Sequence, residues 1–134
     1  MFNSPIFWLV IAVVVPAIFF VILISRRKIK LTNGEEAFVR NQWRMIGKGQ
    51  SPKNDILEAD KLLDFALEKY GYSGGLGEKL KKAGKLFSDE NGIWVAHKIR
   101  NKLAHEINFQ PSEFEFRSAL ESYRKALLDL KIKL

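Results

Sequence analysis

One long apolar segment near the start of the chain limits what this sequence can fold into. Residues 6–24 read IFWLVIAVVVPAIFFVILI, without one charged or strongly polar side chain. Nineteen helical residues, at about 1.5 Å rise each, span roughly the ~30 Å hydrocarbon core of a bilayer. Fifteen of them are Leu, Ile, Val or Phe, which favour insertion, and Pro16 in mid-span is tolerated. The sequence therefore predicts a single transmembrane helix over residues 6–25, after a short tail at 1–5.

A cleaved signal peptide is the alternative interpretation of this segment. Such a peptide has a basic start, a shorter apolar core and a small-residue cleavage site. This chain begins MFNSP and continues after the segment as SRRKIK, which favours an uncleaved anchor. Because basic residues collect on the cytoplasmic side of a span, we expect the N-terminus outside and the C-terminal domain in the cytoplasm, joined by a basic linker at 26–33. The linker is typical of a stop-transfer flank, with attraction to anionic lipid as the alternative.

The rest of the composition excludes several classes of protein. No second apolar run follows, which excludes a multi-span transporter or a channel subunit with its own pore. The absence of cysteine excludes a disulfide-stapled secreted domain, a cysteine zinc site and a thiol enzyme. Beyond the four basic linker residues, eighteen Lys and Arg stand against fifteen Asp and Glu, a net charge of +3. That balance lacks the strong basic patch of a dedicated DNA-binding protein.

Residues 34–134 have the pattern of an all-α domain. Period-2 runs of β-branched residues are absent. Capping boxes at Thr32–Glu35 and Ser112–Glu115 open two helices, and Ser51-Pro52 opens another. The broad apolar face of the helix after Pro52 places it centrally, and short connections favour antiparallel neighbours. The fold class predicted is a transmembrane helix followed by a four- to five-helix antiparallel bundle. Apolar residues at three- and four-residue spacing place its helices at about 34–47, 52–70, 76–87, 91–107 and 113–130.

The helix over 91–107 has two contrasting faces. With about 100° per residue counted from Trp94, Lys98, Asn101 and His105 fall within about 40° of the indole, and His97 lies at about 300°. An exposed tryptophan is unusual, so we expect another helix or another subunit to cover it. A homodimer with Trp94 and Asn101 near its two-fold axis does so. The core face on the other side consists of Val95, Ala96, Ile99 and Leu103.

The order Arg100, Asn101, three spacers and His105 resembles the R-polar-x3-H signature of HEPN domains, set late in a helical bundle. The resemblance covers about residues 50–134. It implies Arg100, Asn101 and His105 as the catalytic residues. Many HEPN domains are metal-independent ribonucleases of toxin, defence or RNA-processing systems and work as dimers with their two motifs facing each other. The resemblance thus implies RNA and an antitoxin-like protein as partners. Other members keep the fold and serve as binding modules.

The chemistry of these residue types suits RNA cleavage. Histidine can take a proton from the 2′-OH or give one to the 5′-oxygen. Arginine grips phosphate and stabilises its developing charge, and asparagine can fix a histidine tautomer. A structural role is the alternative: Arg100 pairs with Glu106 or a neighbouring helix, and His105 caps the end of its own helix. The corresponding function is a non-catalytic helical module that holds a protein, nucleotide or RNA partner at the membrane.

Further candidates come from the same helix and the loop before it. His97, which is not part of the signature, shares the face of Trp94, and with Lys98 and Lys102 it is a candidate substrate-binding residue. We expect no cofactor and no metal, since the two histidines are eight residues apart without a third ligand at metal spacing. The glycines at 74–77 lack a preceding strand and a Lys-Ser/Thr pair, so a flexible turn is favoured over a phosphate loop.

The remaining charges are interpreted as surface features. The lysines at 79, 81, 82 and 85 are expected on a solvated face, with contact to an RNA backbone as the alternative. Asp60, Asp64 and Glu68 lie at helical spacing, and we expect them to pair with basic residues at the surface.

Overall fold

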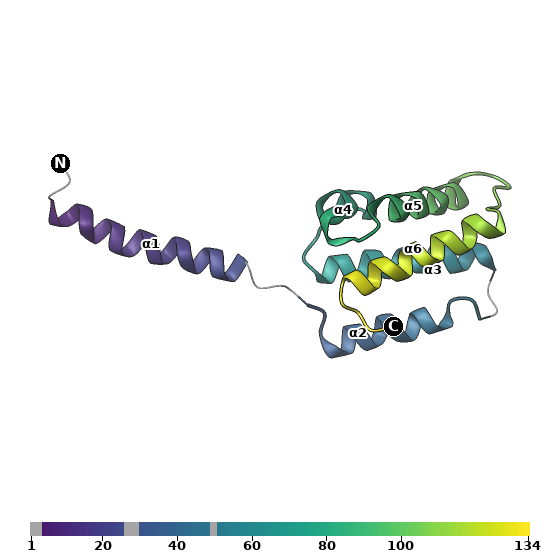
Figure 1. The fold of residues 1–134 in the computed structure, drawn as a ribbon, viewed down its shortest axis with the longest axis horizontal. Coiled ribbons are helices and arrows are strands. Elements are labelled where there is room, and N and C mark those ends of the chain that lie inside the picture. The colour runs from purple at the N-terminus through teal and green to yellow at the C-terminus, as the bar shows by residue number, and fades with distance from the viewer. Residues whose placement is uncertain (1–3, 26–29, 49–50) are drawn as a thin grey trace.

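The computed structural model describes residues 4–25, 30–48 and 51–134, and the regular secondary structure in these ranges is all helical (Figure 1). Within them, no residue forms a β-strand. The expected basic linker at 26–33 lies partly outside the described residues, as do the first three residues of the N-terminal tail. In chain order the elements are α1 (Pro5–Ser25), α2 (Asn33–Met45), α3 (Pro52–Lys69), α4 (Leu76–Ala83), the short 3₁₀ helix η1 (Gly84–Leu86), α5 (Glu90–His105) and α6 (Glu113–Asp129).

Helix α1 differs from all the others because none of its span is buried against the rest of the chain. Residues Pro5–Leu23 have a mean hydropathy of 3.1, and the helix is long and apolar enough to cross a membrane. Pro16 lies inside the helix without ending it. Figure 1 shows α1 apart from the packed helices. A helix that is apolar all round is typical of a buried core or of a membrane span, and this one is not buried.

The predicted helix starts are confirmed by their caps. Thr32 and Ser112 each accept a hydrogen bond from the backbone of the glutamate three residues later, and each glutamate side chain accepts from the cap's own N–H. Ser51 accepts from the Asn54 backbone ahead of α3, with Pro52 at the first helical position. These bonds satisfy N–H groups that a helix start leaves unpaired.

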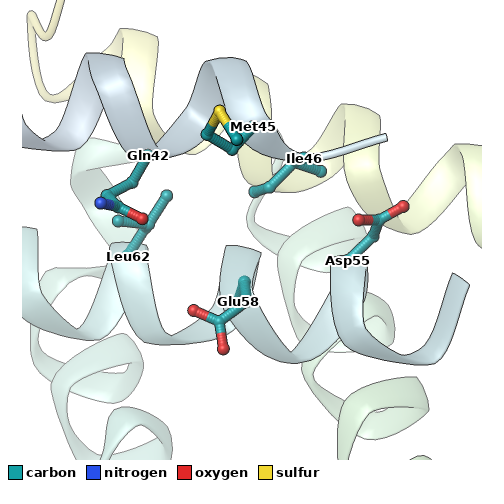
Figure 2. A pocket seen from close by; sticks show the side chains of 6 residues that line it. All are labelled: Gln42, Met45, Ile46, Asp55, Glu58 and Leu62. Carbon is teal, nitrogen blue, oxygen red and sulfur yellow. The ribbon is translucent and has the colours of Figure 1, made fainter. Parts of the chain in front are cut away.

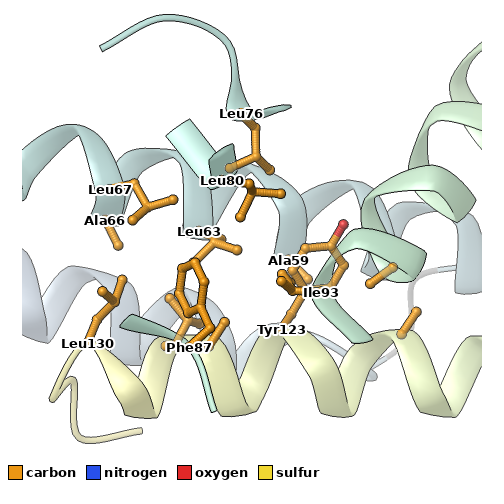
Figure 3. Close-up of a cluster of buried hydrophobic side chains, with 14 of the residues drawn as sticks. Ala59, Leu63, Ala66, Leu67, Leu76, Leu80, Phe87, Ile93, Tyr123 and Leu130 are labelled. Atoms are coloured by element: carbon orange, nitrogen blue, oxygen red, sulfur yellow. The ribbon is translucent and has the colours of Figure 1, made fainter. Parts of the chain in front are cut away.

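Helix α3 is the centre of the bundle, as its broad apolar face predicted. It contacts α2, α4, α5 and α6. Figure 3 shows part of the core, a cluster that includes Leu63 and Leu67 of α3 together with Leu80, Ile93 and Tyr123 from the helices around it. The C-terminal residues close the bundle: the Tyr70 hydroxyl donates to the Leu130 carbonyl, and Ile132 is buried.

Two expectations about α5 are corrected. The helix ends at His105 rather than about Ile107. Val95, expected in the core, is 55% exposed, whereas Ile93 is buried. The core face of α5 is therefore centred on Ala96, Ile99 and Leu103 and extends toward Ile93.

Candidate functional site

Asp60 is the centre of a polar cluster inside the bundle. It lies on α3 and is 4% exposed. Its Oδ1 accepts hydrogen bonds from the Tyr123 hydroxyl at 2.7 Å and from His97 Nδ1 at 2.9 Å. Its Oδ2 lies 3.2 Å from Arg100 Nε. The expectation that Asp60 pairs at the surface is wrong, because α5 and α6 cover this carboxylate and supply all three partners.

The carboxylate fixes the state of the His97 ring. A carboxylate oxygen accepts, so the 2.9 Å contact with Asp60 favours the tautomer that carries a proton on His97 Nδ1. The other nitrogen, Nε2, then accepts from Asn101 Nδ2 at 3.4 Å. The Trp94 ring stands edge-on to the imidazole, with 6.2 Å between centroids. His97 is therefore held from three sides.

Arg100 closes the cluster into a ring of contacts. Its NH1 donates to Asn101 Oδ1 at 3.0 Å, while its buried Nε faces Asp60 as an ion pair without the angle of a hydrogen bond. The side chain remains 29% exposed. The ring runs from Asp60 to His97, Asn101, Arg100 and back to Asp60. Of the expected structural partners, a neighbouring helix is therefore the one that Arg100 uses, and Glu106 is not.

Tyr123 contributes a permanent donor to this ring. Burial, followed by the charge of Asp60, raises the pKa of the Tyr123 hydroxyl far above its usual range. The phenol keeps its proton under all ordinary conditions and donates it to the carboxylate. One carboxylate, one guanidinium and a neutral hydroxyl thus balance within the buried cluster, which is the condition for burying charge at tolerable cost.

The expected site residues fall into two groups. Arg100, Asn101 and His97 are joined in the ring. His105, the last residue of α5, is exposed, as are Lys98 and Lys102. The exposed residues lie on the surface of the helix that carries the ring.

Trp94, the expected dimer contact, is half-buried and packs against the core of its own chain. Its own bundle therefore already covers part of the indole. The homodimer contact through Trp94 and Asn101 stays a prediction.

Sequence reasoning missed Asp60 and the role of Tyr123 in the site. A signal for Asp60 was present, because it lies between Ile56 and Leu63 in the repeat of apolar residues on the buried face of α3. A carboxylate at a core position requires hydrogen-bond donors from within the protein. The sequence of α3 alone does not show which helices supply these donors.

Lys79 is a second buried charge, and its expected solvated position is wrong. It is 2% exposed. Its Nζ reaches from α4 to the Asp64 carbonyl oxygen at 3.2 Å and to Asp64 Oδ1 at 2.9 Å. Glu68 Oε2 lies 3.7 Å away. The lysine thus joins α4 to α3.

A pocket lies between α2 and α3 (Figure 2). Asp55 and Glu58 line it, with Gln42, Met45, Ile46 and Leu62. Its volume is about 110 Å³, well below the ~300 Å³ at which ligand pockets begin. Asp55 accepts from the Gly47 backbone at 3.0 Å, a bond that joins the end of α2 to α3. In the described ranges, no group of three or more His, Asp or Glu could hold a metal ion.

No family model, curated protein or solved structure matches the chain. The geometry around Asp60 therefore carries the functional argument.

Proposed function

We propose that this chain is a membrane-anchored HEPN-like domain that cleaves RNA without metal, as a dimer with its domain in the cytoplasm. The observation that carries the proposal is the ring of contacts through which buried Asp60 holds Arg100 and Asn101. A helix that needed only to pack would not require an arginine, an amide and a histidine tied to one carboxylate. The apolar α1 supplies the anchor, and the basic residues after it set the orientation.

The ring prepares Arg100 for an anionic group. With Nε held by Asp60 and NH1 by Asn101, the guanidinium has little freedom, while nearly a third of the side chain remains accessible to solvent. Preorganised donors stabilise developing charge without reorganising during the reaction. In cleavage, the 2′-oxygen bonds to phosphorus and the bond from phosphorus to the 5′-oxygen breaks. Arg100 balances the charge on the phosphoryl oxygens during that exchange.

His105 supplies the proton transfers. It is exposed at the end of α5, so a substrate can reach its imidazole. One histidine takes the 2′-OH proton and a second gives a proton to the departing 5′-oxygen. His97 is already engaged by Asp60 and Asn101, so the second free histidine comes from another copy of the chain. Anchoring in one membrane raises the local concentration of copies and favours this pairing.

The test is cleavage of single-stranded RNA by the full chain in detergent, with a chelator present. The wild type is expected to cleave and to leave 2′,3′-cyclic phosphate ends. His105→Ala and Arg100→Ala should each lower the rate on the order of 10²–10⁴. Arg117→Ala, an exposed arginine paired with Glu113 on α6, is the matched control and should leave the rate unchanged. The enzyme is ruled out if the wild type cleaves no RNA between pH 5 and pH 9.

A non-catalytic module that holds RNA or a protein at the membrane is the second candidate. The observation that favours it is the Asp60 contact itself, since a guanidinium already paired with a buried carboxylate is also a stable structural element. Binding of RNA by the wild type without cleavage, at every pH tested, would select this candidate.

A further inference from the structure

A groove runs between α5 and α6. Its walls include Val95, Lys98 and Lys102 from α5 and Phe114 and Glu115 from α6, and its volume is about 240 Å³. The two helices pack side by side (Figure 1). The groove is smaller than the pockets that enclose drug-sized ligands, so it suits a single flat ring system that enters from one side.

Phe114 gives the groove an unusual edge. Its side chain is 80% exposed, although it stands at the second position of a helix whose other aromatic rings, Phe116 and Tyr123, pack on the core. Val95, 55% exposed, faces the same groove. A bare aromatic ring over an apolar floor is a stacking surface, and single-stranded nucleic acids bind by stacking bases on such rings.

The charged side chains around the groove differ in sign and in whether they already have a partner. Lys98 is exposed and, within the described residues, makes no hydrogen bond or ion pair. Lys102 lies over the Phe109 ring, with Nζ 5.4 Å from the centroid. The Glu115 carboxylate accepts a hydrogen bond from the Ser112 backbone N–H, and this bond lowers the pKa of the carboxyl. The positive charge of Lys102 lowers it further, so Glu115 is negatively charged. A phosphate is therefore favoured at Lys98 and disfavoured beside Glu115.

We propose that this groove binds one base of single-stranded RNA, stacked on Phe114, while Lys98 holds a neighbouring phosphate. The inference rests on the proposed function, since it adds the substrate-binding surface of that site. Lys98 precedes Asn101 by one helical turn and lies on the helix that ends at His105. A strand that follows α5 from Lys98 toward the end of the helix therefore reaches His105.

The test uses the full chain in detergent, carrying His105→Ala so that bound RNA stays intact. The probe is a fluorescent single-stranded oligouridine, with a second probe of the same length in which one internal base is missing. Phe114→Ala should weaken binding of the complete probe by about 5- to 150-fold, the cost of losing one stacked base. Phe114→Tyr should restore binding. Phe38→Ala, which removes an exposed aromatic ring on α2, is the matched control and should have no effect.

The phosphate contact has its own readout. Lys98→Gln should lower the slope of log Kd against log salt by about 0.7, because one fewer counterion is released from a single strand. Lys81→Gln, an exposed lysine of α4, should leave the slope unchanged. Loss of slope in both variants alike would contradict a specific contact at Lys98.

The outcomes separate this inference from the proposed function. Cleavage by the wild type together with equal RNA affinity of the Phe114→Ala chain overturns the groove and leaves the enzyme. RNA binding that depends on Phe114, without cleavage, supports the groove and contradicts the enzyme. Conversion of a dimer to a monomer by Phe114→Ala, measured by light scattering, overturns the inference because it assigns the groove to contact between copies.

Discussion

Helix α3 takes part in two clusters built around a buried charge, Asp60 on α3 itself and Lys79 on α4, and the two differ in how their partners are arranged. Lys79 is met by Asp64 and Glu68, whose side chains are 39% and 66% exposed, so its contact ends in solvent. Asp60 is met by residues of α5 and α6, and two of these partners, His97 and Arg100, are tied to each other through Asn101. A buried charge whose partners face water acts as a clamp between helices. When the partners of a buried charge are also bonded to one another, the charge fixes the positions of those partner side chains. A reactive site requires side chains held in this way.

The largest effect should come from removing Asp60. Asp60→Ala leaves the Arg100 guanidinium and the Tyr123 hydroxyl without their acceptor in the core, which should lower the free energy of unfolding by about 3–5 kcal/mol. Denaturant unfolding of the full chain in detergent, followed by circular dichroism of the bundle, measures this change. A loss below about 1 kcal/mol would show that water hydrates the Arg100 and Tyr123 groups once Asp60 is removed. The Asp60 and Lys79 clusters would then not differ in their dependence on the buried charge.

Removing Lys79 should cost less. Lys79→Ala leaves Asp64 and Glu68 free to be hydrated, so the loss should be about 1–2 kcal/mol. Lys79→Met keeps the packing of the aliphatic stem and should cost less still. The same unfolding experiment applies. A cost equal to that of Asp60→Ala would mean that both clusters are equally dependent on their buried charge.

A smaller effect is expected at Tyr123. Tyr123→Phe removes one donor to Asp60 while His97 and Arg100 remain, so the loss in unfolding free energy should be about 1 kcal/mol. The ring volume is retained, so no cavity forms. If the loss reached the size expected for Asp60→Ala, the hydroxyl rather than the ion pair would hold the carboxylate.

The smallest effect concerns pH and lies outside both clusters. The Ser112 backbone N–H lowers the pKa of Glu115, so ionised Glu115 stabilises the folded chain above the usual glutamate value of 4.5. That stabilisation disappears as the pH falls through the lowered value. Glu115→Gln should therefore flatten the fall in thermal stability below about pH 4.5, whereas Glu106→Gln, at an exposed position, should not. If thermal stability fell with pH in the same way in both variants, the Glu115 capping bond would not contribute to the pH dependence of stability.

The helices were predictable because their signals are local. Capping boxes at Thr32 and Ser112, and the apolar spacing of α3 and α6, determine the bonds and faces that the structure contains. The end of α5 and the exposure of Val95 were not predictable, since they depend on which neighbouring helices cover each face of α5. Helical periodicity gives a face but not the element that covers it.

The candidate site was predictable only in part. Arg100, Asn101 and His97 were chosen from one helix, and the structure joins them. Asp60, the partner shared by His97 and Arg100, lies 37 residues from His97 in the sequence, and no local pattern connects the two. Lys79 illustrates the same point, since a lysine in a basic run looks solvated until the neighbouring helix supplies Asp64.

The most direct measurement compares RNA cleavage by the full chain carrying Asp60→Asn with cleavage by the chain carrying Lys79→Met, at a temperature where both are folded by circular dichroism. Both substitutions remove a buried charge from a contact of α3, so a general loss of stability would affect them alike. Asp60→Asn should lower kcat by about 10- to 100-fold, because Arg100 loses its positioning partner, while the Lys79→Met chain should cleave as the wild type does. Equal rates in the two variants, or no cleavage by the wild type, would contradict this expectation.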